Sequence, residues 1–78
     1  MAHGQVGKRI AGARIAVGLT QSALARRVHA DVGTISRYER GALTPSVDVL
    51  IKIAKACSTS LEWLATGAGD GPTQATGT

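Results

Sequence analysis

Residues 19–41 read LTQSALARRVHADVGTISRYERG, and this stretch decides the fold. Thr20 is suited to cap a helix, because its hydroxyl can accept a hydrogen bond from a backbone N–H of the first turn. Leu19 and Leu24, on either side of it, have the spacing of a hydrophobic staple. The first half of the stretch therefore predicts a short helix, about residues 21–28.

The same arrangement repeats in the second half of the stretch. Asp31 is placed to cap a second helix, and Ala30 and Ile35 are the matching apolar pair. Gly41 follows as a natural helix stop, since glycine adopts the left-handed conformation that ends many helices. Two short helices joined by a tight turn are predicted.

The second of these helices has two unlike faces on a wheel of about 100° per residue. Ile35, Tyr38 and Glu39 share one face. The opposite face is small, polar and cationic, with Val32, Gly33, Ser36, Arg37 and Arg40. A slim and partly basic outer face suits insertion into the major groove of DNA.

Several motifs together resemble the phage-repressor-type helix-turn-helix family, the lambda-repressor-like or XRE-type fold. They are Leu19-Thr20-Gln21, Leu24-Ala25, residues 35–41, Val6, Ile10 and Arg14 before Gly18, and Pro45-Ser46 through Glu62-Trp63-Leu64. The resemblance covers about residues 5 to 67. It implies an all-α domain of five helices with the helix-turn-helix at the second and third.

The resemblance also implies a set of DNA contacts. Gln21 would donate to a phosphate oxygen at the N-terminus of its helix. Arg37 would bind guanine O6 and N7, and Val32 would pack on a thymine methyl. Gly33 has no side chain to read a base, which favours readout of DNA shape. The candidate contacts are Gln21, Val32, Gly33, Thr34, Ser36, Arg37 and Arg40.

Two further residues invite a structural interpretation. Arg14 lies on the apolar side of the first predicted helix, and a buried guanidinium needs a partner. Glu39 is the candidate, and the resemblance implies the same pair; a DNA contact by Arg14 is the alternative. His29 stands where the family usually has a turn glycine, so we expect a strained positive φ there rather than a metal ligand or pH sensor.

Length and charge limit the possible classes. A chain of 78 residues allows one small domain. The net charge of +4 favours a polyanionic partner, although a ribosomal or membrane-surface protein would fit it as well. Seven Lys or Arg against two acids lie in residues 1–40, and two against three follow. The basic excess thus belongs to the predicted helices that would face phosphates.

Other residue counts exclude further classes. Cys57 has no partner for an internal disulfide, and with no secretory signal in view we expect a cytoplasmic protein. No apolar run approaches the length of about 20 residues that a bilayer requires. The scattered His, Cys and acidic residues form no catalytic or metal constellation, so we expect no enzyme, cofactor or metal site. The resemblance implies a prokaryotic or phage-type, nucleoid-associated protein.

The chain divides into three parts. Residues 1–5 are expected as a flexible arm, residues 6–66 as the DNA-binding domain, and residues 67–78 as a flexible Gly/Thr-rich tail. Residues 47–57 are apolar nearly all round, which predicts a helix at the centre of the core. Ser60 is placed to cap a short last helix.

The leading hypothesis is a transcriptional regulator, a repressor, that binds double-stranded DNA as a homodimer on a pseudo-palindromic site. A dimer is expected because one such domain covers too few base pairs for high selectivity. The alternative is a protein-interaction adaptor, such as an antitoxin or a coactivator-like module, with DNA binding secondary. Val32-Gly33 and the uncharged loop at residues 42–45 keep this alternative open.

Overall fold

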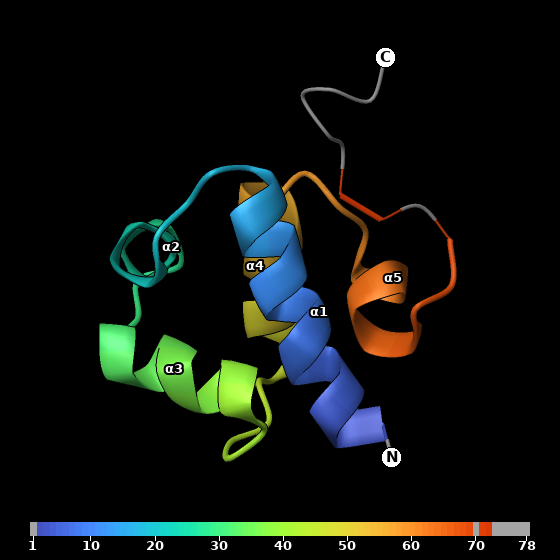
Figure 1. The fold of residues 1–78 in the computed structure, drawn as a ribbon, viewed down its shortest axis with the longest axis horizontal. Helices are drawn as coiled ribbons and strands as arrows, with labels where there is room; N and C mark the ends of the chain where they lie inside the picture. Colours follow the sequence, from blue (N-terminus) through green and yellow to red (C-terminus); the bar gives the residue numbers. More distant parts are fainter. Residues whose placement is uncertain (1, 70, 73–78) are drawn as a thin grey trace.

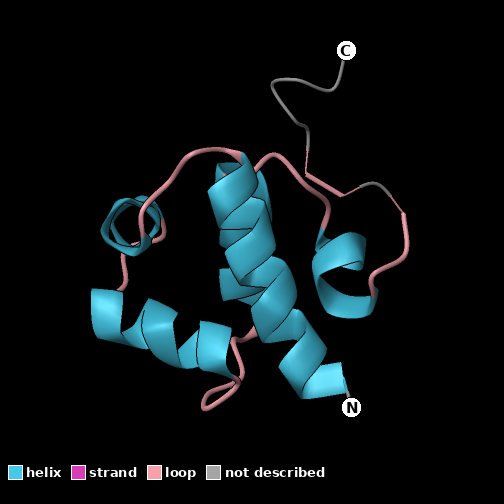
Figure 2. Cartoon of the chain, viewed as in Figure 1, coloured by secondary structure: helices cyan, strands magenta, loops and turns pink. Residues whose placement is uncertain are grey.

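The computed structural model describes residues 2–69 and 71–72, and these form five α-helices and no strand (Figures 1 and 2). The helices are α1 (Ala2–Ala16), α2 (Gln21–Arg27), α3 (Val32–Arg40), α4 (Val47–Ala56) and α5 (Leu61–Thr66). In Figure 1, α2 and α3 lie on one side of α1, and α5 lies on the other. The predicted all-α fold of five helices is confirmed.

Hydroxyl side chains begin three of the helices. Thr20 Oγ1 accepts from Ala23 N at 3.0 Å, and Ser60 Oγ accepts from Trp63 N at 3.0 Å. Ser46 caps α4 in the same way. Asp31 occupies the N-cap of α3 with an extended backbone, but its side chain makes no capping hydrogen bond. The predicted side-chain cap at Asp31 is therefore wrong, although its position is right.

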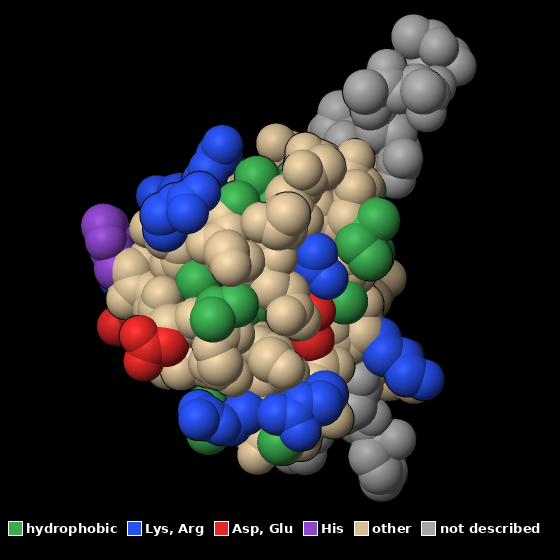
Figure 3. All heavy atoms as spheres, turned by 60° about the vertical axis from the view of Figure 1, so that its left-hand side comes forward, with side chains coloured by type: hydrophobic (Ala, Val, Ile, Leu, Met, Phe, Trp, Pro, Cys, Tyr) green, Lys and Arg blue, Asp and Glu red, His purple; other side chains and the backbone are tan. Residues whose placement is uncertain are grey.

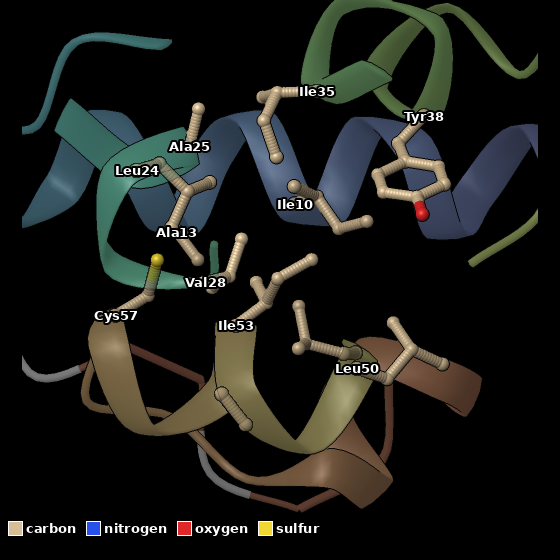
Figure 4. Close-up of a cluster of buried hydrophobic side chains, with 12 residues drawn as sticks. Ile10, Ala13, Leu24, Ala25, Val28, Ile35, Tyr38, Leu50, Ile53 and Cys57 are labelled. Carbon is tan, nitrogen blue, oxygen red and sulfur yellow. The ribbon is translucent and has the colours of Figure 1, made fainter. Parts of the chain in front are cut away.

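The core is built from small and branched side chains of all five helices (Figure 4). Its fully buried large members are Ile10, Leu24, Ile35, Ile53, Leu64 and Cys57. Leu50, Ile53 and Ala54 carry α4 into this core. Val47 and Ile51, on the same helix, are 61% and 36% exposed. The expectation of a helix at the centre of the core is corrected, because the described part of the chain leaves one face of α4 exposed.

Two residues of α1 hold the helices on either side. Gly7 is buried, and a Cβ added there would lie 2.5 Å from Tyr38 O and 2.7 Å from Glu39 O. The backbones of α1 and α3 therefore meet at a point where no side chain fits. On the other side, Arg9 Nε donates to Leu64 O at 2.8 Å and its Nη2 to Ala65 O at 3.1 Å. These bonds satisfy carbonyls in the last turn of α5, which lack helical partners.

The described residues at the two ends of the chain belong to α1 or lie next to α5. The first helix starts at Ala2, so residues 2–5 have helical backbone. After α5, a Cβ added at Gly71 would lie 3.1 Å from the Trp63 ring, so the chain returns against α5. Met1, Asp70 and residues 73–78 of the expected arm and tail lie outside the described residues. None of the helices over residues 2–69 and 71–72 is long and apolar enough to cross a membrane.

Candidate nucleic-acid interface

The third helix separates its two faces as the wheel predicts. Ile35 is fully buried and Tyr38 is 8% exposed, whereas Val32 is 47% exposed. The other residues of the outer face remain accessible: Gly33, Arg37 and Arg40 are exposed, and Thr34 and Ser36 are half-buried. Within residues 2–69 and 71–72 no other element covers this outer face, so it is available to a partner.

The turn before α3 sets the direction of this helix. His29 has a φ of 58°, so the expected positive φ at a non-glycine residue is present. The N–H of Ala30 donates to Ala25 O at 2.9 Å, which closes the end of α2. Buried Val28 anchors the turn on the core. At the other end of α3, Gly41 adopts a φ of 78° and stops the helix as predicted.

A polar network joins α1, α2 and α3 beneath the outer face. Arg14 Nε donates to Glu39 Oε2 at 2.7 Å, and Arg14 Nη2 donates to Glu39 Oε1 at 3.1 Å. Arg14 Nη1 also donates to Leu19 O at 2.9 Å. The two charged side chains are only 14% and 7% exposed, so a bidentate pair neutralises them where water is scarce. The structure thus brings Arg14 and Glu39 together and fixes α3 against α1.

Gln21 belongs to the same network. Its Nε2 donates to Glu39 Oε1 at 3.0 Å, so the carboxylate accepts hydrogen bonds from both the arginine and the amide. An amide group has two N–H donors, and this bond uses one of them. Gln21 is half-buried at the first position of α2, and its second N–H remains for another acceptor.

The arginines of the outer face lean toward the start of α3. Arg40 Nε donates to Ser36 Oγ at 3.3 Å, one helical turn earlier. Arg37 reaches back in the same direction, since its Nη2 lies 4.0 Å from the position of a Cβ added at Gly33. Side chains of a helix point toward its N-terminus, which explains the common direction. Both guanidinium groups therefore lie over the turn before their own Cα atoms.

Cationic side chains lie at the edges of the side of the molecule that carries α2 and α3. Figure 3 brings the side with α2 and α3 forward, and blue side chains form separate groups at its upper and lower edges. The exposed arginines of the two helices are Arg26 and Arg27 on α2 and Arg37 and Arg40 on α3. Such a distribution attracts a polyanion toward the outer face of α3.

Cys57 is fully buried in the core and does not belong to this surface. Burial raises the pKa of its thiol from an ordinary value of 9.0 to about 11, and Glu39 acts in the same direction. Arg14 and Arg27 oppose these effects only partly. The thiol therefore stays protonated and behaves as a small apolar side chain. Within residues 2–69 and 71–72, no group of three or more His, Cys, Asp or Glu residues could hold a metal.

Sequence reasoning missed three residues. Gly7 had a visible signal, because glycine inside a helix is unfavourable unless close packing requires it. Arg9 had none, since its partners are backbone carbonyls 55 and 56 residues away. Ser58, with a φ of 55°, gave little local indication that it repeats the conformation of His29.

The sequence model of the helix-turn-helix family matches residues 10–64. An uncharacterized HTH-type transcriptional regulator of Haemophilus influenzae is 44% identical over 46 residues, which are 59% of this chain and 19% of that protein. The chain thus spans about a fifth of the length of this curated relative.

Solved structures of phage and bacterial proteins have a similar fold. The P22 c2 repressor, solved in complex with a synthetic operator, has a TM-score of 0.76 and 30% identity, over 81% of this chain and 96% of that chain. The restriction-modification controller protein C.AhdI of Aeromonas hydrophila has a TM-score of 0.74 and 30% identity, over 78% of this chain and 92% of that chain.

Proposed function

The chain belongs to the helix-turn-helix family of DNA-binding transcription regulators, and from this premise we propose that it binds double-stranded DNA with α3 in the major groove. The observation that carries the proposal is the division of α3 into a buried face and an open, cationic one. The major groove is wide enough to admit one α-helix, so α3 can insert with its outer face toward the bases.

Each candidate residue has a distinct role in the proposed complex. Arg37 reads a base edge, Val32 contacts a neighbouring base, and Thr34, Ser36 and Arg40 contact bases or phosphates beside them. Gln21 donates its second amide N–H to a phosphate, while its bond to Glu39 holds the side chain in place. The Arg14–Glu39 pair positions α3 and makes no contact with DNA.

The regulatory setting is part of the same proposal. One domain covers few base pairs, so we propose a homodimer on a pseudo-palindromic site, acting as a repressor. The similarity to the P22 c2 repressor supports this role, because that protein was solved in complex with a synthetic operator. We place the protein in a prokaryotic or phage-type cytoplasm, on nucleoid DNA.

The first test is a titration of a DNA duplex with the protein at two salt concentrations, in which fluorescence anisotropy measures binding. Raising the salt about fourfold is expected to weaken binding steeply, because each phosphate contact releases counterions. Selection from a random duplex library then gives the preferred site. Arg37→Ala is expected to cost about 1–3 kcal/mol at one base pair and to relax preference there.

Lys55→Ala is the matched control. Lys55 is an exposed cation in the last turn of α4, outside the two helices of the proposed interface, so its removal leaves base preference unchanged. Binding that does not depend on salt, or an Arg37→Ala variant with the parent's base preference, contradicts the proposed docking. An absence of duplex binding supports the protein-interaction adaptor instead.

A further inference from the structure

The first turn of α3 contains a glycine that the fold itself does not require. A Cβ at Gly33 would meet no backbone of another described element, whereas a Cβ at Gly7 would lie 2.5 Å from a carbonyl oxygen of α3. Gly33 also lacks the positive φ that favours glycine at Gly18 and Gly41. Glycine inside a helix lowers helix stability relative to alanine, so Gly33 destabilises α3 although the packing does not require a glycine there.

What occupies the space beside Gly33 is the guanidinium of Arg37. The position of an added Cβ lies 4.0 Å from Arg37 Nη2, which is ordinary van der Waals contact. A longer side chain at position 33 would extend into the region where this guanidinium lies. The two residues are one helical turn apart on the exposed face, so they compete for the same part of the surface.

We infer that Gly33 is a specificity-determining residue: its missing side chain seats the Arg37 guanidinium over the first turn of α3, where it reads a guanine. This inference rests on the proposed function. Recognition helices contact base edges mainly with their N-terminal residues. Arg37 lies in the second half of α3, and only by folding back over Gly33 does it place its charge at that end.

The chemistry of the base follows from the guanidinium. Its parallel N–H donors match O6 and N7 of guanine, which both accept in the major groove. The neighbouring arginine does not compete for this role in the same position, because Arg40 Nε is directed at Ser36 Oγ. Arg37 thus supplies the hydrogen bonds to a base at the start of α3, where Val32 and Gly33 have no hydrogen-bonding side chain.

The experiment compares substitutions at position 33 in the full chain. Gly33→Ala adds only the Cβ, which the 4.0 Å distance accommodates, so it is expected to lower the guanine preference less than a longer side chain does. Gly33→Leu fills the space and is expected to lower that preference about tenfold, within the discrimination of one bidentate pair. Site selection from a random duplex library measures the preference for each variant.

Arg37→Ala and the Gly33→Leu/Arg37→Ala double variant complete a cycle that separates seating from general damage. Gly33→Leu is expected to have no further effect on guanine preference once Arg37 is absent. Thermal unfolding by circular dichroism checks the fold, and Gly33→Leu is expected to be at least as stable as the parent because leucine favours helix.

The outcomes distinguish this inference from the proposed function. A parent chain that selects a guanine through Arg37, with the same preference in Gly33→Leu, overturns the inference and leaves DNA binding intact. The inference also fails if the parent's guanine preference survives Arg37→Ala, or if Gly33→Leu weakens it equally in both backgrounds. A parent chain that binds no duplex refutes both.

Discussion

The two helix pairs of this domain, α2–α3 and α4–α5, are joined by turns of the same build. Residues 28–31 and 57–60 each place a non-glycine residue at positive φ, with His29 at 58° and Ser58 at 55°. In each turn the next N–H donates to the carbonyl five residues earlier at 2.9 Å. Each turn begins with a buried residue and ends at the N-cap of the next helix.

The helices that follow these turns differ in how much of their surface the rest of the molecule covers. Helix α3 keeps an open face with two arginines, whereas α5 lies beside α1 and its last carbonyls accept hydrogen bonds from Arg9. Turn geometry therefore does not distinguish the helix pair that we propose to read DNA from a structural pair. What distinguishes them is the surface that the rest of the molecule leaves uncovered.

The largest expected effect comes from Gly7→Ala, which acts on the first pair through α1. The added Cβ meets two backbone carbonyls of α3 at 2.5 and 2.7 Å, and backbone atoms cannot move aside as a side-chain end can. We expect the free energy of unfolding to fall by about 3 kcal/mol, measured by urea denaturation.

Gly12→Ala is the matched control on the same helix. A Cβ at this exposed position has nothing within 4 Å, so the substitution is expected to stabilise the protein by up to about 1 kcal/mol. Equal effects of the two substitutions would show that α1 and α3 do not require this close approach.

The next prediction concerns the buried residues at which the two turns begin, Val28 and Cys57. Only Cys57 has a side chain that titrates. The folded pKa of the Cys57 thiol, about 11, exceeds its ordinary 9.0, so the folded state keeps its proton longer than the unfolded state. The resulting stability is present below about pH 9 and is lost as the pH rises toward about 11. By about pH 10.5 the loss is about 2 kcal/mol.

Urea denaturation at about pH 8 and about pH 10.5 measures this loss. Cys57→Val gives the second turn the apolar residue of the first and removes the titrating thiol, so its stability is expected to fall less between the two pH values. Because each variant is compared with itself, a change in packing does not affect the result. Identical falls in the two proteins would mean that the thiol titrates alike in the folded and unfolded states.

The smallest effect concerns the N-caps at the ends of the turns. Ser60 Oγ accepts from Trp63 N at 3.0 Å, while the Asp31 side chain makes no such bond. We expect Ser60→Ala to cost about 1 kcal/mol and Asp31→Ala no more than about 0.5 kcal/mol, which reflects its charge near the helix dipole. Thermal unfolding of both variants decides, and equal losses would contradict the difference in capping.

Local sequence patterns predict much of the fold, above all where α2 to α5 begin and where α3 ends. Thr20, Ser46 and Ser60 cap helices because hydroxyl side chains satisfy free N–H groups within the same few residues. Gly41 ends α3 for an equally local reason. The same logic failed at Asp31, where the type of residue was right and the bond is absent.

Contacts between distant segments were less predictable. The bonds from Arg9 to α5 join a side chain to backbone groups, and every residue has such groups, so no pattern marks them. The exposed face of α4 had the composition of a buried one, because hydrophobicity records what can be covered and not whether a neighbour is present.

By itself the sequence determined where α2, α3, α4 and α5 begin, which face of α3 is apolar, and that its opposite face is cationic, since these depend on residues within one or two turns. Only the tertiary structure decided that Gln21 and Arg14 both bond to Glu39, that the backbone of α3 packs directly on α1 at Gly7, and that the described residues leave the outer face of α3 exposed. These features depend on distances between separate helices, and such distances are set by how the helices pack together in the core.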